Sequence, residues 1–202
     1  MAENFWNKRY AAPGFLFGVT PAKFLFDSSA YLKRGQTALA VADGEGRNSV
    51  YLAEKGLQVT AVDSSDVAVD KARGLAAARG AAVDFHIADL KDWDWDAAQY
   101  DVVAAIFIQF AGPGFRAQIF SGLQNALKPG GILLLHGYTP EQIKLGTGGP
   151  PYVENMYTED MLEDAFGDLD ILRLSSYRRA VDEGRGHSGM SALIDLVARK
   201  PG

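Results

Sequence analysis

Residues 38–63, ALAVADGEGRNSVYLAEKGLQVTAVD, constrain the fold more than any other part of the sequence. An apolar run leads into a turn that contains glycines. An amphipathic segment follows, and Gly56 separates it from a second apolar run that ends at Asp63. This order is typical of a strand, a tight turn, a helix and a second strand that ends in an acid. The stretch therefore predicts half of a nucleotide-binding α/β fold.

The rest of the chain repeats this alternation. Strands are predicted at residues 37–42, 58–62, 83–87, 100–108, 132–136, 169–177 and 190–199. Helices are predicted at residues 21–34, 48–55, 67–80, 115–127 and 158–166, and a polar loop at residues 91–99. Strands that alternate with helices give a parallel sheet with helices on both faces, and the last two strands, joined by a glycine-rich turn, predict an antiparallel pair at one edge.

We expect one domain over residues 1–202, with its core at residues 37–202. The segment before the core, residues 1–36, is rich in aromatic side chains. So many aromatic residues before the first strand predict a segment that covers the core, or a lid over a pocket.

The composition limits the classes of function. The chain has no cysteine, three histidines and a formal net charge of -5. Without cysteine, thiolate nucleophiles and Cys-ligated metal sites are impossible, and the histidines lack the spacing of a metal site. The acidic balance disfavours nucleic acid as a partner. The longest apolar run, residues 102–108, is too short to span a bilayer, so we expect a cytoplasmic protein without a membrane partner.

The turn after the first predicted strand indicates the charge of a ligand. Gly44 and Gly46 allow tight turning and a close approach of the backbone to a ligand. A dinucleotide-binding turn has a third glycine where this chain has Ser49. Asp43 and Glu45 flank Gly44 and would repel a pyrophosphate. The turn therefore favours a ligand that carries positive charge and no phosphate.

Two further acids follow predicted strands. Asp63, at the end of the second strand, can accept hydrogen bonds from both hydroxyls of a ribose, or it can cap the next helix. Asp89, after the third strand, can accept from an adenine amino group with Leu90 packed near the ring, but aspartate is also a common turn residue. Both acids would lie at the carboxyl ends of parallel strands, where open α/β sheets bind ligands.

These residues resemble the class I S-adenosyl-L-methionine-dependent methyltransferases over roughly the first two-thirds of the chain. The resemblance extends to the small bacterial group of tellurite-resistance-type and thiopurine-methyltransferase-like enzymes. The matching residues are Gly44-Glu45-Gly46-Arg47-Asn48-Ser49, Tyr51-Leu52-Ala53, Gly56, Val59 and Asp63, with supporting matches at residues 5–10, 18–21, 100–101 and 127–131.

The chain departs from the pattern of this class at three positions. Ala40 stands where the class has an acid inside the first strand, and Ala42 stands where it has a glycine. Asp43 is placed to replace the missing acid. Gln109 stands where relatives have a histidine after the fourth strand.

The resemblance implies a Rossmann-like, mostly parallel sheet of seven strands, in the order 3-2-1-4-5-7-6 with strand 7 antiparallel and helices on both faces. It implies S-adenosyl-L-methionine as the methyl donor and S-adenosyl-L-homocysteine as the product, with the donor over the carboxyl ends of strands 1 to 4. The implied donor-binding residues are Asp43, Gly44, Gly46, Asn48, Asp63, Ser64, Asp89, Leu90 and Ile106.

We expect the methyl group to pass to a small-molecule acceptor. His187, in a glycine-rich turn between the last strands, can orient or deprotonate an acceptor, or it can be a turn histidine bonded to the backbone. Tyr138, after the fifth strand, can point into an acceptor pocket or be a surface aromatic residue. These two are the catalytic candidates. His136 is expected to end the fifth strand as a structural residue, and Arg47 to pair with Glu45 or Asp43.

Two other functions fit parts of the sequence. A non-catalytic sensor of S-adenosyl-L-methionine would explain the departures at Ala40 and Ala42. An NAD(P)-dependent oxidoreductase would use the same fold, but Ser49 and the acidic turn disfavour it.

Overall fold

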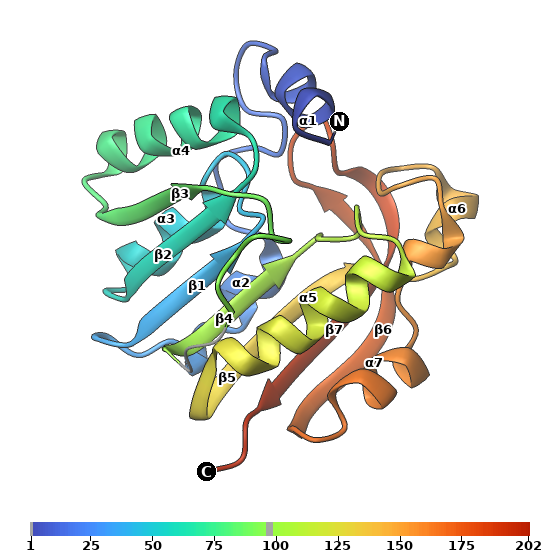
Figure 1. Ribbon diagram of the computed structural model, residues 1–202. Coiled ribbons are helices and arrows are strands. Elements are labelled where there is room, and N and C mark those ends of the chain that lie inside the picture. Colours follow the sequence, from blue (N-terminus) through green and yellow to red (C-terminus); the bar gives the residue numbers. More distant parts are fainter. Residues whose placement is uncertain (1, 96–98) are drawn as a thin grey trace. The chain divides into compact units, whose positions relative to one another are not determined.

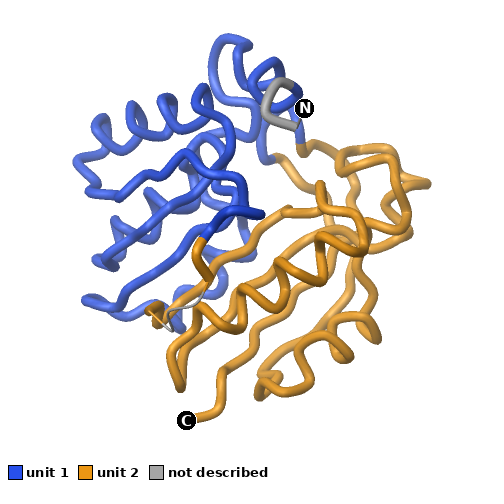
Figure 2. Tube along the Cα trace, in the orientation of Figure 1, with its two compact units in different colours: residues 1–93, 183–186 blue, residues 94–182, 187–202 orange. Residues whose placement is uncertain are grey.

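The computed structural model describes residues 2–95 and 99–202, so part of the predicted 91–99 loop lies outside the described residues. The chain divides into two compact units, which Figure 2 shows in different colours. Unit 1 contains Met1–Trp93 and Glu183–Gly186, and unit 2 contains Asp94–Asp182 and His187–Gly202. Among the described residues, no helix is both long and apolar enough to cross a bilayer.

Unit 1 combines three parallel strands with helices (Figure 1). Its strands are β1 (Thr37–Val41), β2 (Gln58–Asp63) and β3 (Val83–Ile87). Its helices are α1 (Ala2–Tyr10), α2 (Lys23–Asp27), the 3-10 helix η1 (Ser29–Tyr31), α3 (Arg47–Glu54) and α4 (Asp66–Arg79). β2 pairs in parallel with both β1 and β3. Helix α3 packs against β1 and β2, and α4 against β2 and β3.

Unit 2 contains four strands. They are β4 (Tyr100–Ile106), β5 (Leu127–Tyr138), β6 (Asp170–Asp182) and β7 (Ser188–Arg199). Its helices are α5 (Pro113–Ala126), α6 (Gln142–Leu145), the 3-10 helix η2 (Val153–Asn155) and α7 (Glu159–Phe166). β4 and β5 are parallel, whereas β7 is antiparallel to both β5 and β6.

The strands form one seven-stranded sheet in the order β3-β2-β1-β4-β5-β7-β6. This confirms the predicted sheet, its order and the antiparallel position of β7. The central strands carry long apolar runs, as is expected for strands whose two faces are both covered. In β4, for example, the residues from Val102 to Ile106 are all buried.

Short-range sequence signals mark the ends of α4 and the start of α7. The Ser65 side chain caps α4 by accepting from the Ala68 amide at 3.1 Å, and Gly80 ends that helix in the left-handed region with φ 62°. The Thr158 hydroxyl caps α7 by accepting from the Met161 amide at 3.2 Å. In both helices the capping side chain lies three residues before the amide that it accepts from, so the signal is local in the sequence.

Two predictions about the first 36 residues differ from the structure. Residues 21–34 do not form one helix, because α2 ends at Asp27 and the short η1 follows. The Ser28 amide donates to the carbonyls of both Phe24 and Leu25, so the helix tightens into a 3-10 turn at this point. Helix α1 was not predicted, because its mixed pattern shows no clear apolar face and α1 is instead held by contacts with α4.

The two helix-interior glycines Gly74 and Gly122 test the packing of α4 and α5. A methyl group on Gly74 would meet nothing within 4 Å, so Gly74→Ala should raise the free energy of unfolding by about 0.5–1 kcal/mol. A methyl group on Gly122 would lie 2.3 Å from the Trp95 ring, so Gly122→Ala should lower it by about 1–3 kcal/mol. Urea unfolding of both variants measures these values. A Gly122→Ala variant as stable as the wild type would contradict the packing of Trp95 on α5.

Candidate functional site

The turn between β1 and α3 begins the candidate site in unit 1. Three of its residues have left-handed backbones: Ala42 with φ 49°, Gly44 with φ 64° and Gly46 with φ 90°. Ala42 therefore holds the conformation for which a glycine is favoured. The Asp43 amide donates to the Val62 carbonyl at 3.1 Å, which ties the turn to the end of β2.

The Asp63 carboxylate organises the turn from the end of β2. One oxygen accepts from the Gly44 amide at 2.8 Å, and the other accepts from the Ser65 amide at 2.8 Å. Burial raises the pKa of Asp63, and these backbone donors oppose that rise. Asp63 therefore has a structural role in holding the turn, and it also lies at the strand end where a ribose is expected.

Asp43 is the acid of the turn that stays available to a cation. Its carboxylate accepts from the Ser49 amide at 3.1 Å and from the Ser49 hydroxyl. Desolvation raises the pKa of Asp43 to about 6, although both Ser49 contacts favour the ionised form. The residue remains partly accessible to solvent. A cation placed near Asp43 would offset the cost of its ionisation.

Glu45 serves a different purpose from the one its position suggests. It is 3% exposed, and its carboxylate pairs with Lys71 of α4 at 2.9 Å. The same carboxylate accepts from the Leu16 amide at 2.6 Å. Glu45 therefore holds the N-terminal segment against the turn, and its charge is compensated within unit 1.

The expected partner of Arg47 was wrong. Arg47 pairs with Glu183 at 2.8 Å instead of with Glu45 or Asp43, and both side chains of this pair are 7% exposed. The other oxygen of Glu183 accepts from the Lys23 amide at 3.1 Å. Glu183 lies far along the sequence in the connection between β6 and β7, so no local pattern could indicate this pair.

The glycines of the turn make room for protein atoms. A Cβ on Gly44 would lie 2.8 Å from the Tyr10 hydroxyl oxygen, and a Cβ on Gly46 would lie 2.7 Å from the Ala72 Cβ. Gly46 thus permits close packing between the turn and α4. Asn48, a predicted donor-binding residue, accepts from the Ala22 amide at 3.0 Å through its side-chain oxygen. The local role of these residues is to assemble the turn with its neighbours.

Helix α1 contributes two residues that were not predicted as part of the site. Tyr10 is 5% exposed, and its pKa is raised well above the usual range. Burial is the main cause, and the negative charges of Asp63 and Glu45 add to it. The Asn7 side-chain oxygen lies 2.6 Å from the Ser65 hydroxyl. The segment before the core thus packs against the turn. In the sequence, the one indication that this segment takes part in the site was the match of residues 5–10 to the methyltransferase class.

The remaining donor-site candidates of unit 1 follow β2 and β3. The Ala88 amide donates to the Asp63 carbonyl at 3.0 Å, which places Asp89 just beyond the paired ends of these strands. The Asp89 carboxylate accepts from the Lys91 amide at 3.0 Å, as a turn aspartate does. Leu90 is buried and Ser64 is partly exposed. Unit 1 therefore gathers Asp43, Gly44, Asp63, Ser64 and Asp89 at the carboxyl ends of its strands.

Both catalytic candidates belong to unit 2, and they lie in one aromatic cluster with Phe107. The ring of Phe107 lies 4.1 Å from that of His187 and 4.8 Å from that of Tyr138, centroid to centroid. His187 and Tyr138 meet edge to face at 5.7 Å. Tyr138 is 1% exposed, so it is not a surface aromatic residue. Ile106, the residue before Phe107, is buried at the end of β4.

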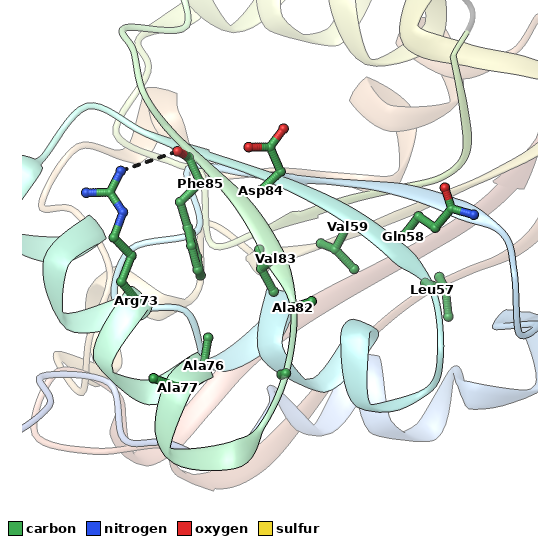
Figure 3. A pocket seen from close by; sticks show the side chains of 11 residues that line it. Leu57, Gln58, Val59, Arg73, Ala76, Ala77, Ala82, Val83, Asp84 and Phe85 are labelled. Atoms are coloured by element: carbon green, nitrogen blue, oxygen red, sulfur yellow. Dashed lines mark hydrogen bonds between the residues drawn. The ribbon is translucent and has the colours of Figure 1, made fainter.

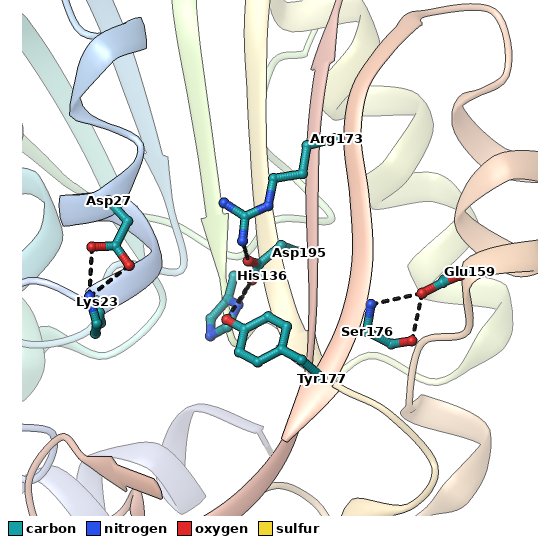
Figure 4. A network of polar contacts seen from close by, with 8 residues as sticks. All are labelled: Lys23, Asp27, His136, Glu159, Arg173, Ser176, Tyr177 and Asp195. Carbon is teal, nitrogen blue, oxygen red and sulfur yellow. Dashed lines mark hydrogen bonds and ion pairs between the residues drawn. The ribbon is translucent and has the colours of Figure 1, made fainter. Parts of the chain in front are cut away.

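His136 also joins this cluster, and a buried carboxylate fixes its ring (Figure 4). His136 Nδ1 lies 2.7 Å from an Asp195 oxygen, and neither side chain is exposed. Tyr177 donates to the same oxygen at 3.1 Å, and Arg173 donates to the other. His136 does not end β5, which continues to Tyr138. The contact with Asp195 orients the imidazole as a buried carboxylate orients a histidine in many enzymes.

Gln109 holds Tyr138 from the backbone. Its side-chain amide donates to the Tyr138 carbonyl at 2.8 Å, and its side-chain oxygen accepts from the Tyr138 amide at 2.6 Å. Asn155 in turn donates to the Gln109 carbonyl at 3.0 Å. Gln109 thus has a structural role, because it braces the backbone of Tyr138.

A groove of about 620 Å³ lies elsewhere in unit 1 (Figure 3). Residues 57–59 and 81–85 line it together with part of α4, and none of the donor-site candidates does so. Most of its side chains are small and apolar, and Arg73 donates across it to the Phe85 carbonyl at 3.5 Å. Among the described residues, no group of three or more histidines and acids is placed to hold a metal ion.

Comparisons with known proteins concern the family and the fold of the chain. A family model described as "Methyltransferase domain" matches residues 38–131, which include the turn, β2, β3, β4 and α5. A search of curated proteins found no match. The match covers the residues that carry the donor-site candidates of unit 1.

Solved structures share the fold of the whole chain. One, described for the conversion of a disulfide bond into a thioacetal group during echinomycin biosynthesis, has a TM-score of 0.75 at 20% identity, covering 100% of this chain and 93% of that one. A SAM-dependent methyltransferase from Methanosarcina mazei has a TM-score of 0.72 at 19% identity, covering 87% and 97%. TehB from Haemophilus influenzae has a TM-score of 0.68 at 18% identity, covering 98% and 66%.

At these identities the likeness to solved structures shows a common fold, and fold alone does not determine a reaction. The family match over residues 38–131 and these structures together show that the chain resembles methyltransferases in sequence and fold. The narrower resemblance to tellurite-resistance-type and thiopurine-methyltransferase-like enzymes stays a prediction.

The raised pKa of Asp43 predicts how stability depends on pH. Because the folded-state pKa of about 6 exceeds the usual 3.8, ionising Asp43 costs stability as the pH rises from about 4 through 6. Asp43→Asn removes that cost. Between pH 4 and pH 7, we expect the free energy of unfolding of the variant to rise by about 1–2 kcal/mol relative to that of the wild type. This value is reduced because Asp43 is partly exposed to solvent.

Urea unfolding at several pH values measures this gain. Asp164→Asn, at an exposed position on α7, is the matched control and should keep the wild-type pH profile. A stability difference between Asp43→Asn and the wild type that stays constant with pH would contradict the raised pKa.

Proposed function

We propose that this protein transfers a methyl group from S-adenosyl-L-methionine to a small-molecule acceptor. The observation that carries the proposal is the charge state of the β1–α3 turn. Arg47 and Lys71, the basic side chains at the turn, are taken by Glu183 and Glu45. Asp43 is left with a desolvated carboxylate that a ligand cation would stabilise.

The residues of the turn fit this donor better than a dinucleotide. S-adenosyl-L-methionine carries an ammonium and a sulfonium and no phosphate, whereas a pyrophosphate would meet the acids Asp43 and Asp63. Asp43 would hold the ammonium, and Asp63 would accept from the ribose. Asp89 and Leu90 are suited to the adenine amino group and ring. Tyr10, above Gly44, adds a buried aromatic wall to the same site.

Methyl transfer from a sulfonium requires the protein mainly to position the donor and the acceptor. The donor, when bound, supplies a methyl carbon that is already activated by the positive sulfur. The chain's own residues must align the acceptor, exclude water and, where the acceptor atom carries a proton, remove it. No metal or redox group is needed for such an in-line displacement, so a site made of aromatic rings and histidines is sufficient.

On the acceptor side we propose His187 and Tyr138. Each has its ring in the cluster around Phe107, and a histidine can take a proton near neutral pH. The acidic net charge of -5 disfavours a nucleic acid as the acceptor. These features support a small acceptor that is enclosed by aromatic side chains.

Titration calorimetry tests the donor. We expect S-adenosyl-L-homocysteine to bind the wild-type protein and NADH not to bind. Asp63→Asn, which keeps the shape of the side chain, should weaken S-adenosyl-L-homocysteine more than about 10-fold, or about 1.4 kcal/mol. Asp84→Asn, at an exposed position on β3, should bind like the wild type. Binding of NADH alone would overturn the proposal, and unchanged affinity in Asp63→Asn would remove Asp63 from the site.

Turnover tests the acceptor side. With labelled donor and a panel of small metabolites, the wild type should release S-adenosyl-L-homocysteine with at least one acceptor. His187→Gln should lower kcat for that acceptor about 100-fold, the usual range for losing a positioned acid or base, while donor affinity stays the same. His86→Gln is the matched control, since His86 is partly exposed on β3. Full turnover by His187→Gln would exclude His187 from catalysis. Tight donor binding with no turnover at all would favour the sensor.

A further inference from the structure

Phe107 has a strained backbone that the proposed function does not yet explain. It follows the last residue of β4 and has φ 57°, in the left-handed region. A bulky residue in this region is a true outlier, and such outliers gather at ligand sites. Glycine would adopt the same conformation without strain. The position therefore retains a ring where the backbone alone would favour glycine.

The surroundings of Phe107 hold it in this conformation. Its amide donates to the His136 carbonyl at 2.8 Å. Its ring meets the rings of His136 at 4.7 Å, Tyr138 at 4.8 Å and His187 at 4.1 Å. The Phe107 ring thus lies within 5 Å of all three of these rings.

Two of the neighbours of Phe107 are fixed by other contacts. His136 is held through Nδ1 by the buried Asp195 (Figure 4). Tyr138 is held on both sides of its backbone by Gln109. Phe107 therefore packs on a rigid base that is formed by β5 and β7.

His187 lies in the connection between β6 and β7, and this connection is anchored next to it. The Gly186 amide donates to the Leu16 carbonyl at 3.1 Å. The His187 side chain is buried, and the Phe107 ring lies nearer to its ring, at 4.1 Å, than the Tyr138 ring does, at 5.7 Å. The Phe107 ring is therefore placed to fix the orientation of the His187 imidazole.

We propose that Phe107 is a positioning residue, which uses its strained backbone to present an aromatic face that fixes the His187 imidazole. Asp195 and His136 support Phe107 from behind. The catalytic meaning of this arrangement rests on the proposed function, in which His187 acts on the acceptor. The positioning itself does not depend on that function and can be measured without donor or acceptor.

Imidazole NMR spectra of the whole protein test the proposal. The chain has three histidines, and His187→Gln identifies the His187 signals. Phe107→Leu removes the ring but keeps apolar bulk and the strained backbone, so the His187 ring protons should move downfield and their signals should broaden. Phe107→Tyr keeps the ring and should keep the wild-type His187 signals. Phe110→Leu, at a partly exposed ring three residues along the chain, is the matched control and should change nothing at His187.

Kinetics give the second readout. With an acceptor that the wild type methylates, Phe107→Leu should lower kcat about tenfold or more, because small displacements of a reacting group are costly. The KM for the donor should stay within about twofold, because the donor-site candidates at the turn lie in unit 1. Phe107→Tyr should restore kcat. A general loss of stability would affect both parameters and would not be rescued in this selective way.

His187 signals in Phe107→Leu that coincide with those of the wild type would overturn the proposal. If Phe107→Leu does not fold, Phe107→Met offers another apolar side chain without a ring and should give the same result. Binding of S-adenosyl-L-homocysteine separates the proposed function from the positioning role of Phe107. If the wild type does not bind S-adenosyl-L-homocysteine, the proposed function is overturned. Displaced His187 signals in Phe107→Leu would still support the positioning role in that case.

Discussion

The carboxylate of Asp63 is the interaction on which the arrangement of unit 1 depends. Its two oxygens accept from the Gly44 amide and the Ser65 amide, and so join the end of β2 to the β1–α3 turn and to the start of α4. Burial makes this ionised group costly, so its hydrogen bonds are required and not optional. A neutral side chain could hold one of these amides, but only a carboxylate accepts from both and still has lone pairs for a ligand.

The charges around the turn are divided between structure and ligand. Glu45 and Arg47 look like ligand-facing residues in the sequence, yet Lys71 and Glu183 compensate their charges within unit 1. Buried pairs of this kind hold segments in register more than they add stability. Asp43 receives only hydroxyl and amide donors from Ser49, so its carboxylate keeps an unfavourable charge. The compensated pairs thus assemble the turn, and Asp43 is the acid that our proposal assigns to the cation of the donor.

The sequence predicts the parts of this protein that short-range rules determine. Apolar runs, helix caps and the glycine-rich turn lie within a few residues of one another, and from them the parallel sheet and its antiparallel edge were predicted. The order of the strands, which the structure confirms, came from the resemblance to the methyltransferases. The site was predicted less completely, because its contacts join distant segments. His136 and Asp195 are 59 residues apart, and Lys23 and Glu183 are 160 apart. Helix α1 was missed because its own sequence has no clear apolar face and tertiary contacts decide its structure.

Departures from local rules mark the places where function is concentrated. Ala42 and Phe107 are the described non-glycine residues with positive φ, and they follow β1 and β4 at the carboxyl ends of these strands. A sequence selected for stability alone would place glycine at both positions. At Ala42 the side chain is a single methyl group, and among the described residues the structure shows no contact of this group that would account for the strain. At Phe107 the strained backbone carries a ring that three other rings contact, and His187 is the nearest of them. In our proposal, the strain at Phe107 is the cost of holding the His187 ring in place.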